Sequence, residues 1–411
     1  MSKLNFASFI SFFLKSTLRH KDFRLLWTST FISSTARWAD VIVIGWLTLD
    51  LSESPLMVGI VAGSKMAGYI LAPIMGMAAD RMNRRKLLII ASLINVLVSV
   101  AMILLIFSGH LQMSLLIALA LISSVTWAID NPTRQAFIAD LVPAEDISNA
   151  IAFNSVATEM TIVIGPSIGG LLIPSFGLLG AYLTITFIFG VDLIVLFFIN
   201  AKKHIIFKNK ESAFKSLHSG FTYVLGNQVV FLLLAIAFLL NLLVAPYRYA
   251  FLPLFARYTL HAGSQGYGVM TSMAGVGALL AGITILSFTP LKRKGRWILV
   301  GALGWAISLV FLAFSQWYFV SIGLVFLAGL SQAITWTFIA TLIIEHTAPD
   351  MRGRVMGIRT AAVISLPLGN LIAGALAENL GVSVAQAIFA LTALVFMALI
   401  IVAKPTFAHL D

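Results

Sequence analysis

The stretch GMAADRMNRRK, residues 76–86, places one acid and four bases between two long apolar segments. The chain has 411 residues, of which 60% are hydrophobic and only 10% are charged. A soluble protein of this length could not bury so much apolar surface in one core, so lipid must surround most of the chain. The charged stretch is therefore interpreted as a short polar loop between two membrane-spanning helices.

Twelve apolar segments have the length of about twenty residues that crosses the hydrocarbon core as a helix. We place these spans near residues 25–48, 57–78, 87–108, 113–130, 148–172, 178–199, 229–250, 266–287, 297–315, 318–340, 356–377 and 383–402. The predicted fold class is therefore an all-α membrane protein with twelve transmembrane helices. An even number of spans puts both termini on one side of the membrane.

The distribution of basic residues assigns that side. Nearly all of the 27 Lys and Arg residues fall in the two tails or in the loops after spans 2, 4, 6, 8 and 10, whereas the other loops carry only Arg248 and Arg257. Because cytoplasmic loops collect basic residues, we predict a bacterial inner-membrane protein with both termini in the cytoplasm. The net charge of +11 then reflects loops that face anionic lipid and not nucleic acid.

The chain divides at its midpoint into two halves that repeat each other weakly. Thr126-Trp127 recurs as Thr335-Trp336, and VPAED at 142–146 has a counterpart in APDMR at 348–352. Duplicated halves around a central site are a transporter architecture. The predicted segments are an amphipathic cytoplasmic N-terminal segment at 1–22, a six-helix bundle at 23–199, a cytoplasmic linker at 200–228, a second, pseudo-symmetric six-helix bundle at 229–403 and a cytoplasmic tail at 404–411.

The opening stretch contains groups that could hold one conformation and release another. Gly76 allows close helix packing, and Asp80 could accept hydrogen bonds at the N-terminus of a neighbouring helix. Arg81, Arg84 and Arg85 could pair with acids and backbone carbonyls. We predict that this cluster gates the conformational change; the alternative is that its bases only fix the topology.

Three features resemble the major facilitator superfamily. GMAADRMNRRK is similar to its loop signature G-x-x-x-D-R-x-G-R-R/K, with Asn83 in place of the usual glycine. GPSIGG, with Gly165, Pro166, Gly169 and Gly170, resembles the signature of its drug-exporting antiporters. These residues are expected to make a close-packed, bendable helix and to take part in conformational gating. The stretches at 131–155 and 352–358 resemble the twelve-span branch that contains siderophore and macrolide exporters. There are departures: residues 282–296 keep the bases of the loop signature without its acid, and predicted span 4 contains no arginine.

The resemblance implies a central cavity lined by spans 1, 4, 7 and 10. Polar and aromatic residues at helical spacing in the last three of these spans are candidates for contact with a substrate. Trp127 and Trp336 could hold a planar ligand between them; alternatively, both are packing residues. The candidates are Ser123, Thr126, Trp127, Asn241, Gln332, Thr335 and Trp336.

Ionisable residues far from span ends are the strongest functional candidates, because each costs roughly 2.5–3.5 kcal/mol at mid-membrane and needs a partner. Arg37, Asp40, Lys65 and Glu159 fall near half depth and are predicted to form one layer. We predict proton coupling at Asp40 and Glu159, with Arg37 and Lys65 able to receive an anionic substrate group. The alternative is a static network of ion pairs. Asp192 in span 6 is expected to be paired structurally.

The function predicted is secondary active transport, namely proton-coupled export of a siderophore, drug or metabolite by alternating access. Two alternatives remain: an importer or symporter of a small organic anion, and a non-transporting receptor or scaffold. The chain has no cysteine and no G-x-x-x-x-G-K-[ST] loop, which excludes thiol chemistry and an ATP-driven pump formed by this chain alone. We expect no enzyme activity, cofactor or metal, and a monomer whose partners are its substrate, protons and lipid.

Overall fold

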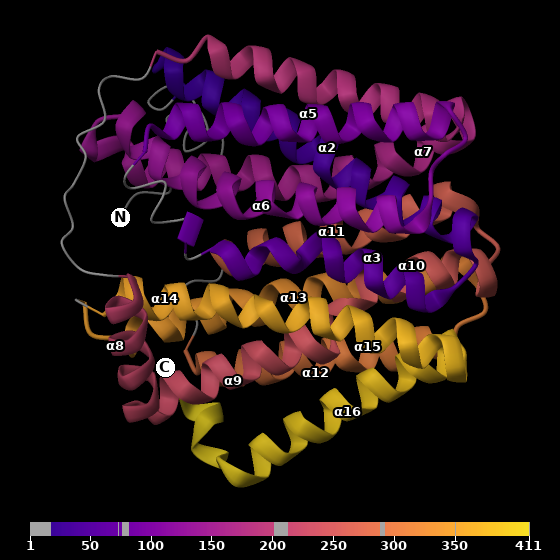
Figure 1. Ribbon diagram of the computed structural model, residues 1–411. Helices are drawn as coiled ribbons and strands as arrows, with labels where there is room; N and C mark the ends of the chain where they lie inside the picture. The colour runs from indigo at the N-terminus through magenta and orange to yellow at the C-terminus, as the bar shows by residue number, and fades with distance from the viewer. Residues whose placement is uncertain are drawn as a thin grey trace.

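The computed structural model describes residues 18–72, 74–75, 82–200, 213–287, 292–349 and 351–410, and every regular element in this part of the chain is a helix. In Figure 1 the helices run side by side in two groups, the N-terminal half above the C-terminal half. The elements are α2 Lys21–Ser52, α3 Pro55–Ala67, η1 Gly68–Leu71, α5 Arg84–Phe107, α6 Met113–Leu141, η2 Ala144–Asp146, α7 Ile147–Phe197, α8 Ala213–Gly226, α9 Gln228–Leu243, η3 Ala245–Arg248, α10 Phe251–Leu254, η4 Phe255–Thr259, α11 Gly263–Ser287, α12 Lys294–Phe314, α13 Tyr318–Glu345, α14 Arg352–Ala361, η5 Ala362–Ile364, α15 Ser365–Leu380, α16 Val382–Ala403 and η6 Pro405–His409.

Helix lengths account for twelve membrane crossings. Nine helices of the described chain are long and apolar enough to span a membrane. One of them contains α7, which would be roughly 75 Å long if it were straight and far longer than the hydrocarbon core is thick. It is interrupted at Gly177, where φ is 67°, and doubles back (Figure 1). With α2 and the shorter α3–η1 the chain crosses twelve times, which confirms the predicted fold class.

The seventh span is broken. After α9 the chain continues through the 3-10 turn η3, the four residues of α10 and the π-helical turn η4. Pro246 and Pro253 lie in these short elements, and proline removes a backbone donor and clashes with the preceding turn. Arg248 ends η3 inside the protein, with only 6% of its surface exposed. The prediction that Arg248 belongs to an outer loop is therefore wrong.

Each half contains an ion pair at the equivalent position, and we call this position the corner of the half. In the N-terminal half Arg84, at the start of α5, pairs with Asp140 near the end of α6 at 2.8 Å. In the C-terminal half Lys294, at the start of α12, pairs with Glu345 at the end of α13, also at 2.8 Å. The same two helices of each half are thus joined at the same end by an ion pair.

The halves meet through glycines at two places. Where α3 crosses α15, a Cβ atom on Gly59 would lie 2.8 Å from the Cα of Gly374. Where α7 crosses α11, a Cβ on Gly170 would lie 2.9 Å from the Cα of Gly268. No side chain fits either crossing, so the backbones of the two halves touch directly.

The residues before α2 attach to the N-terminal half through Asp146. Its carboxylate is 3.1 Å from His20 Nε2 and 3.2 Å from Arg19 Nη2. These hydrogen bonds, that of His20 first, hold the pKa of Asp146 below its usual value. Most of the amphipathic segment predicted at 1–22 lies outside the described residues.

Candidate functional site

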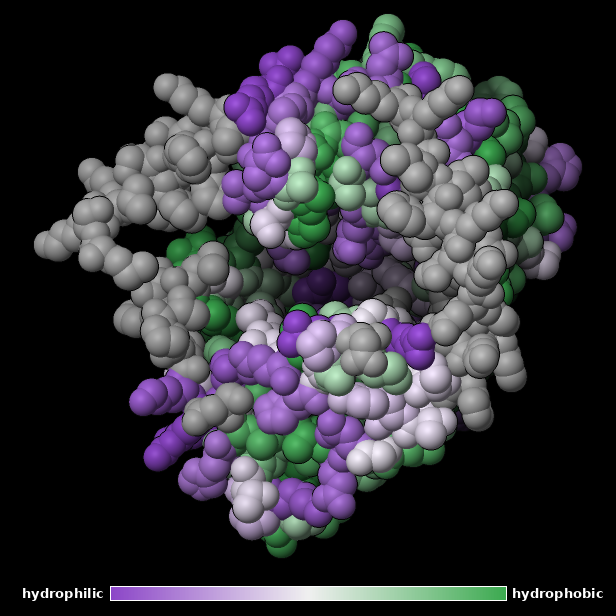
Figure 2. Space-filling model, turned by 90° about the vertical axis from the view of Figure 1, so that its left-hand side faces the viewer, coloured by the Kyte–Doolittle hydropathy of each residue, from purple (hydrophilic) through white to green (hydrophobic). Residues whose placement is uncertain are grey.

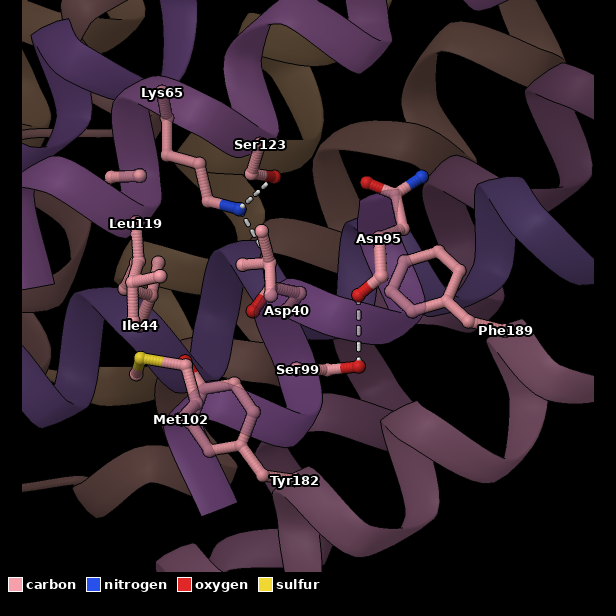
Figure 3. A pocket seen from close by; sticks show the side chains of 12 residues that line it. Asp40, Ile44, Lys65, Asn95, Ser99, Met102, Leu119, Ser123, Tyr182 and Phe189 are labelled. Atoms are coloured by element: carbon pink, nitrogen blue, oxygen red, sulfur yellow. Dashed lines mark hydrogen bonds and ion pairs between the residues drawn. The ribbon is translucent and has the colours of Figure 1, made fainter. Parts of the chain in front are cut away.

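Asp40 and Lys65 form a buried ion pair inside the N-terminal half (Figure 3). Lys65 Nζ on α3 also donates a hydrogen bond to Ser123 Oγ on α6, at 3.1 Å. Beside the pair lies a cavity of about 20 Å³, which Asn95 and Tyr182 also line. This volume holds about one water molecule. The space therefore suits the exchange of a proton and is too small for an organic compound.

A second set of buried charges joins α2, α6 and the end of α7. Arg37 Nη2 lies 3.0 Å from one oxygen of Asp130, and Arg134 Nε lies 2.8 Å from the other. Arg134 also lies 3.7 Å from Asp192, which accepts hydrogen bonds from two serine hydroxyls. Two bases and two acids thus balance in charge. Each has a partner, as buried charges require.

These contacts bear on two expectations. Two members of the predicted layer, Arg37 and Asp40, belong to separate ion pairs, because Arg37 pairs with Asp130 and Asp40 pairs with Lys65. The statement that span 4 contains no arginine is wrong, because α6 continues past Pro132 to Leu141 and buries Arg134. The internal proline is why the sequence pattern misplaced this arginine. Its four-residue spacing from Asp130, which places both on one helix face, was the signal that could have found it.

A larger cavity of about 330 Å³ lies between the two halves. At the end of the molecule where α8 lies, the surface is hollowed between the two groups of helices, and hydrophilic residues are visible in its depth (Figure 2). Most of the lining comes from the C-terminal half. The lining residues are Tyr69 and Asn131 from the N-terminal half and Asn241, Ala245, Tyr247, Arg248, Tyr249, Gln332, Trp336, Arg359, Val363 and Leu366 from the C-terminal half.

Arg248 is the buried charge of this cavity. Its Nη2 donates hydrogen bonds to Gln332 Oε1 at 3.2 Å and to the Tyr247 hydroxyl at 3.4 Å. The guanidinium carbon lies 5.8 Å from the ring centroid of Trp38, which comes from the N-terminal half. The Nε atom is buried without a hydrogen-bond partner. Within the described residues, no carboxylate lies at ion-pair distance from Arg248.

Two further charged residues belong to this region. Arg359 lines the cavity, is half-buried, and makes no hydrogen bond or ion pair with any residue that the structure describes. Glu159 on α7 is exposed, and its charge interacts electrostatically with Arg248 from beyond ion-pair distance. Glu159 therefore does not share the closed environment of Asp40.

The predicted substrate residues other than Trp127 separate into three groups. Asn241, Gln332 and Trp336 line the central cavity. Thr126 and Thr335 are fully buried and do not line the central cavity. The Thr335 hydroxyl is hydrogen-bonded within its own helix, and that of Thr126 both within α6 and to Asn95 Oδ1 on α5, at 2.8 Å. Both are therefore packing residues. Ser123, Arg37 and Lys65 belong to the ion-paired interior of the N-terminal half and do not line the central cavity.

Trp127 does not face Trp336 across the cavity. Its ring is half-buried, 6.1 Å from Tyr69 and 6.0 Å from Trp38, both edge-on. Tyr69 lines the cavity where Trp127 was expected to. The two tryptophans are equivalent in the repeat but not in their exposure to the cavity.

The opening cluster is described only in part. Arg84 donates to the carbonyl of Ala136 at 2.7 Å as well as to Asp140, and Arg85 donates to the carbonyls at the end of α7. Asn83 caps α5, because its side chain accepts a hydrogen bond from Lys86 N at 3.1 Å. Three residues for which the sequence predicted a gating role, Gly76, Asp80 and Arg81, lie outside the described residues.

The glycine-rich signature of α7 mediates close packing on two sides. A Cβ on Gly165 or Gly169 would clash with α2, at 2.4 Å from the Trp38 Cβ and 2.5 Å from the Ala39 carbonyl oxygen, respectively. Gly170 meets α11 of the other half. Pro166 lies inside this helix. The signature therefore packs α7 closely against its own half and brings it into backbone contact with the opposite half.

Polar contacts join the two halves at the end opposite the hollow, where α2 runs into α3 (Figure 1). Arg257 pairs with Asp50, and the Tyr258 hydroxyl donates to the Glu53 carbonyl at 2.9 Å. Glu378 accepts hydrogen bonds from Ser54 Oγ at 2.8 Å and from Leu56 N at 3.1 Å. We call these contacts the latch; its residues are Asp50, Glu53, Ser54, Leu56, Arg257, Tyr258 and Glu378.

Twelve spans in two groups, with a polar cavity between them, define a membrane transporter of the major facilitator fold. The solved structures that resemble this chain agree. The nucleoside transporter NupG matches with a TM-score of 0.74 at 12% identity, over 93% of this chain and 98% of that one. A D-xylose–proton symporter matches with a TM-score of 0.69 at 17% identity, over 91% and 96%.

The chain belongs to the transmembrane secretion effector family, whose profile matches residues 14–410. It is 26% identical to the enterobactin exporter EntS of Escherichia coli over 383 residues, which cover 88% of this chain and 86% of the exporter. It is also 25% identical to the staphyloferrin A transporter of Staphylococcus aureus over 152 residues, 36% of this chain and 38% of that protein. These matches confirm the superfamily and the exporter branch that the sequence motifs indicated.

Proposed function

We propose that this protein exports a small organic compound, such as a siderophore, drug or metabolite, in exchange for protons by alternating access. The observation that carries the proposal is the central cavity, with the surface hollowed between the halves at one end and the latch joining them at the other. This is one of the two end states that alternating access requires. The name of one relative, an enterobactin exporter, supports export, and that of another, a staphyloferrin A transporter, supports transport of a small organic compound.

The orientation follows from the basic residues. The hollowed end carries α8 and the Lys294–Glu345 corner, and it is the end we assign to the cytoplasm by the distribution of Lys and Arg. In this orientation the cavity takes up cargo from the cytoplasm and the latch closes the outer side. We propose a monomer in the bacterial inner membrane, with both termini cytoplasmic.

We place proton coupling at Asp40. The support is geometric: Asp40 pairs with Lys65 beside a space for about one water molecule. Trp38 lies on the same turn of α2, contacts Arg248 and stacks on Tyr249 at 6.4 Å. A shift of this turn would therefore change the Asp40–Lys65 pair and one wall of the cargo cavity together.

Glu159 favours a second candidate function. Its carboxylate partly offsets the charge of Arg248 from the same region, so protonating Glu159 strengthens the field that Arg248 exerts on an anion. A proton and an anionic cargo would then bind together, which is the requirement for symport. Exchange instead requires that proton binding and cargo binding favour opposite conformational states, for which Asp40, outside the cargo cavity, is the candidate proton site.

The test begins by comparing metabolites in the medium and in cells with and without the protein. A compound that moves to the medium only when the protein is present supports export, and one that accumulates inside cells contradicts it. This compound is then added to everted vesicles that carry a proton gradient. Exchange predicts proton release from the vesicles on its addition, whereas symport predicts no such release.

A further inference from the structure

The basic residues inside the described part of the protein fall into two classes. In the N-terminal half Arg37, Lys65 and Arg134 each lie within 4.0 Å of a carboxylate. In the C-terminal half Arg248 and Arg359 have no such partner among the described residues, and both line the central cavity. The first class is neutralised by the protein itself. The second leaves the cavity with positive charge.

Arg248 is built to receive an anion. A guanidinium offers five N–H donors in a planar fork that matches the two oxygens of a carboxylate. Gln332 and Tyr247 bind only Nη2, and Nε is buried without a partner. A buried cation without a counter-ion is costly, so an arriving oxyanion gains both a charge partner and unfilled donors.

The rest of the lining describes the remainder of the ligand. Trp336, Tyr249 and Tyr69 bring aromatic rings to the same cavity. Aromatic side chains favour flat apolar groups, which they contact through stacked or edge-on rings. None of the residues that line the cavity is an acid. A cationic cargo therefore has no counter-charge in the wall.

We propose that the cargo is an aromatic or otherwise planar compound that carries a carboxylate or equivalent oxyanion, which Arg248 and Arg359 bind from the C-terminal half. The inference rests on the proposed function, in which this cavity is the cargo site. It moves the anion-binding role from Arg37 and Lys65, where the sequence pattern had suggested it, to two arginines of the opposite half. Cargo binding and proton coupling are then carried out by different halves.

Three probes of the same shape and different charge test this proposal. They are 1-naphthoate, its neutral amide 1-naphthamide and the cation 1-naphthylmethylammonium, titrated by calorimetry into the purified full-length protein in lipid nanodiscs. We expect 1-naphthoate to bind about 10- to 100-fold more tightly than the amide, since a hydrogen-bonded charge pair carries the difference. The cation should bind no better than the amide.

Arg248→Gln and Arg359→Gln should each reduce the preference for the anion, Arg248→Gln more strongly because its guanidinium is the more buried. Arg248→Lys keeps the charge without the fork and should retain part of the preference. Arg296→Gln is the matched control: it removes one exposed positive charge of the same half and should leave binding unchanged. If Arg248→Gln does not fold, Arg359→Gln alone decides.

Equal or absent binding of 1-naphthoate by the unmodified protein overturns the inference, as does an anion preference that survives loss of both arginines. The metabolite comparison described above keeps the two proposals apart. If the protein exports a compound but shows no preference for anions, the inference about the cargo is wrong and the proposed export function still holds. Anion preference that depends on Arg248, without any exported compound, supports the site and contradicts the export function.

Discussion

The two halves of this transporter have equivalent helices, but one buries charged residues where the other buries apolar residues. Both tie the same corner with an ion pair, Arg84 with Asp140 and Lys294 with Glu345. Deeper in α6 the N-terminal half buries Asp130 and Arg134, whereas the corresponding stretch of α13 buries apolar residues. These apolar residues, all fully buried, are Ile339, Leu342 and Ile343.

This contrast shows how a duplicated fold can divide its work. Buried charges that satisfy one another hold the N-terminal half together and leave one small polar cavity beside Asp40. The apolar core of the C-terminal half needs no such network, so its arginine in the broken seventh span is available to the central cavity. The following predictions would break or sharpen this division.

The largest effect is expected on stability. Asp130→Asn leaves Arg37 and Arg134 without their shared carboxylate, and breaking a buried pair in this way costs about 3–5 kcal/mol. Ile339→Val, at a similar depth in the other half, should cost only about 0.5–1.5 kcal/mol. Denaturant unfolding in detergent measures both values. Equal costs would show that the two halves do not differ in what stabilises them.

Proton coupling should be lost without loss of binding when the small ion pair is removed as a unit. Asp40→Asn combined with Lys65→Met avoids leaving an unpaired lysine. We expect proton movement in everted vesicles to fall at least about tenfold while 1-naphthoate affinity stays within about twofold, because the pair lies outside the cargo cavity. A matching loss of affinity would place cargo binding in the N-terminal half and contradict the division.

Glu159→Gln removes the acid whose field reaches Arg248. Because Glu159 is exposed and not in contact with Arg248, its effect is screened, and 1-naphthoate affinity at neutral pH should rise only about two- to fivefold. The same substitution in the Arg248→Gln background should have no effect. A full effect there would mean that Glu159 acts on the ligand without Arg248.

The smallest effect is expected at the latch. Glu378→Gln weakens an exposed contact, and such contacts contribute about 0.2–1 kcal/mol, so the hollowed state should lose population about two- to fivefold at most. The chain has no cysteine, so Asn131→Cys gives a single reporter on an exposed residue of the cavity lining. Its labelling by an impermeant maleimide in everted vesicles should slow. The control Glu345→Gln, within one half, should not change the labelling rate.

Much of the fold followed from the sequence, because runs of apolar residues and the bias of basic residues are physical requirements of a membrane. Asn241, Gln332 and Trp336 were found as cavity residues because they are polar or aromatic residues on spans 7 and 10, two of the four spans that the family resemblance places around the cavity. Two other residues were misplaced. Pro132 made the end of span 4 seem to come early, so the buried Arg134 was counted as a loop base. Arg248 was counted with the outer loops although it lies inside the span placed at 229–250, and the structure buries it.

Pairing partners could not be predicted in the same way. Arg37 and Asp40 lie three residues apart on α2, yet their partners come from α6 and α3, which no pattern within one span reveals. Tyr69 covers Trp127 because α3 continues into the turn η1 beside α6. Such choices depend on how helices are rotated against their neighbours, and the apolar pattern of a lipid-embedded helix defines that rotation poorly.

The two glycine crossings have a mechanical consequence. No side chains interdigitate at these crossings, so the two backbone surfaces can rotate against each other with little steric resistance. We therefore propose the line through the Gly59–Gly374 and Gly170–Gly268 contacts as the pivot for the rocking motion that alternating access requires. Substitution of one of these glycines by alanine would add a methyl group to this line, hinder the relative rotation of the two bundles and hold the protein in one of its two end states.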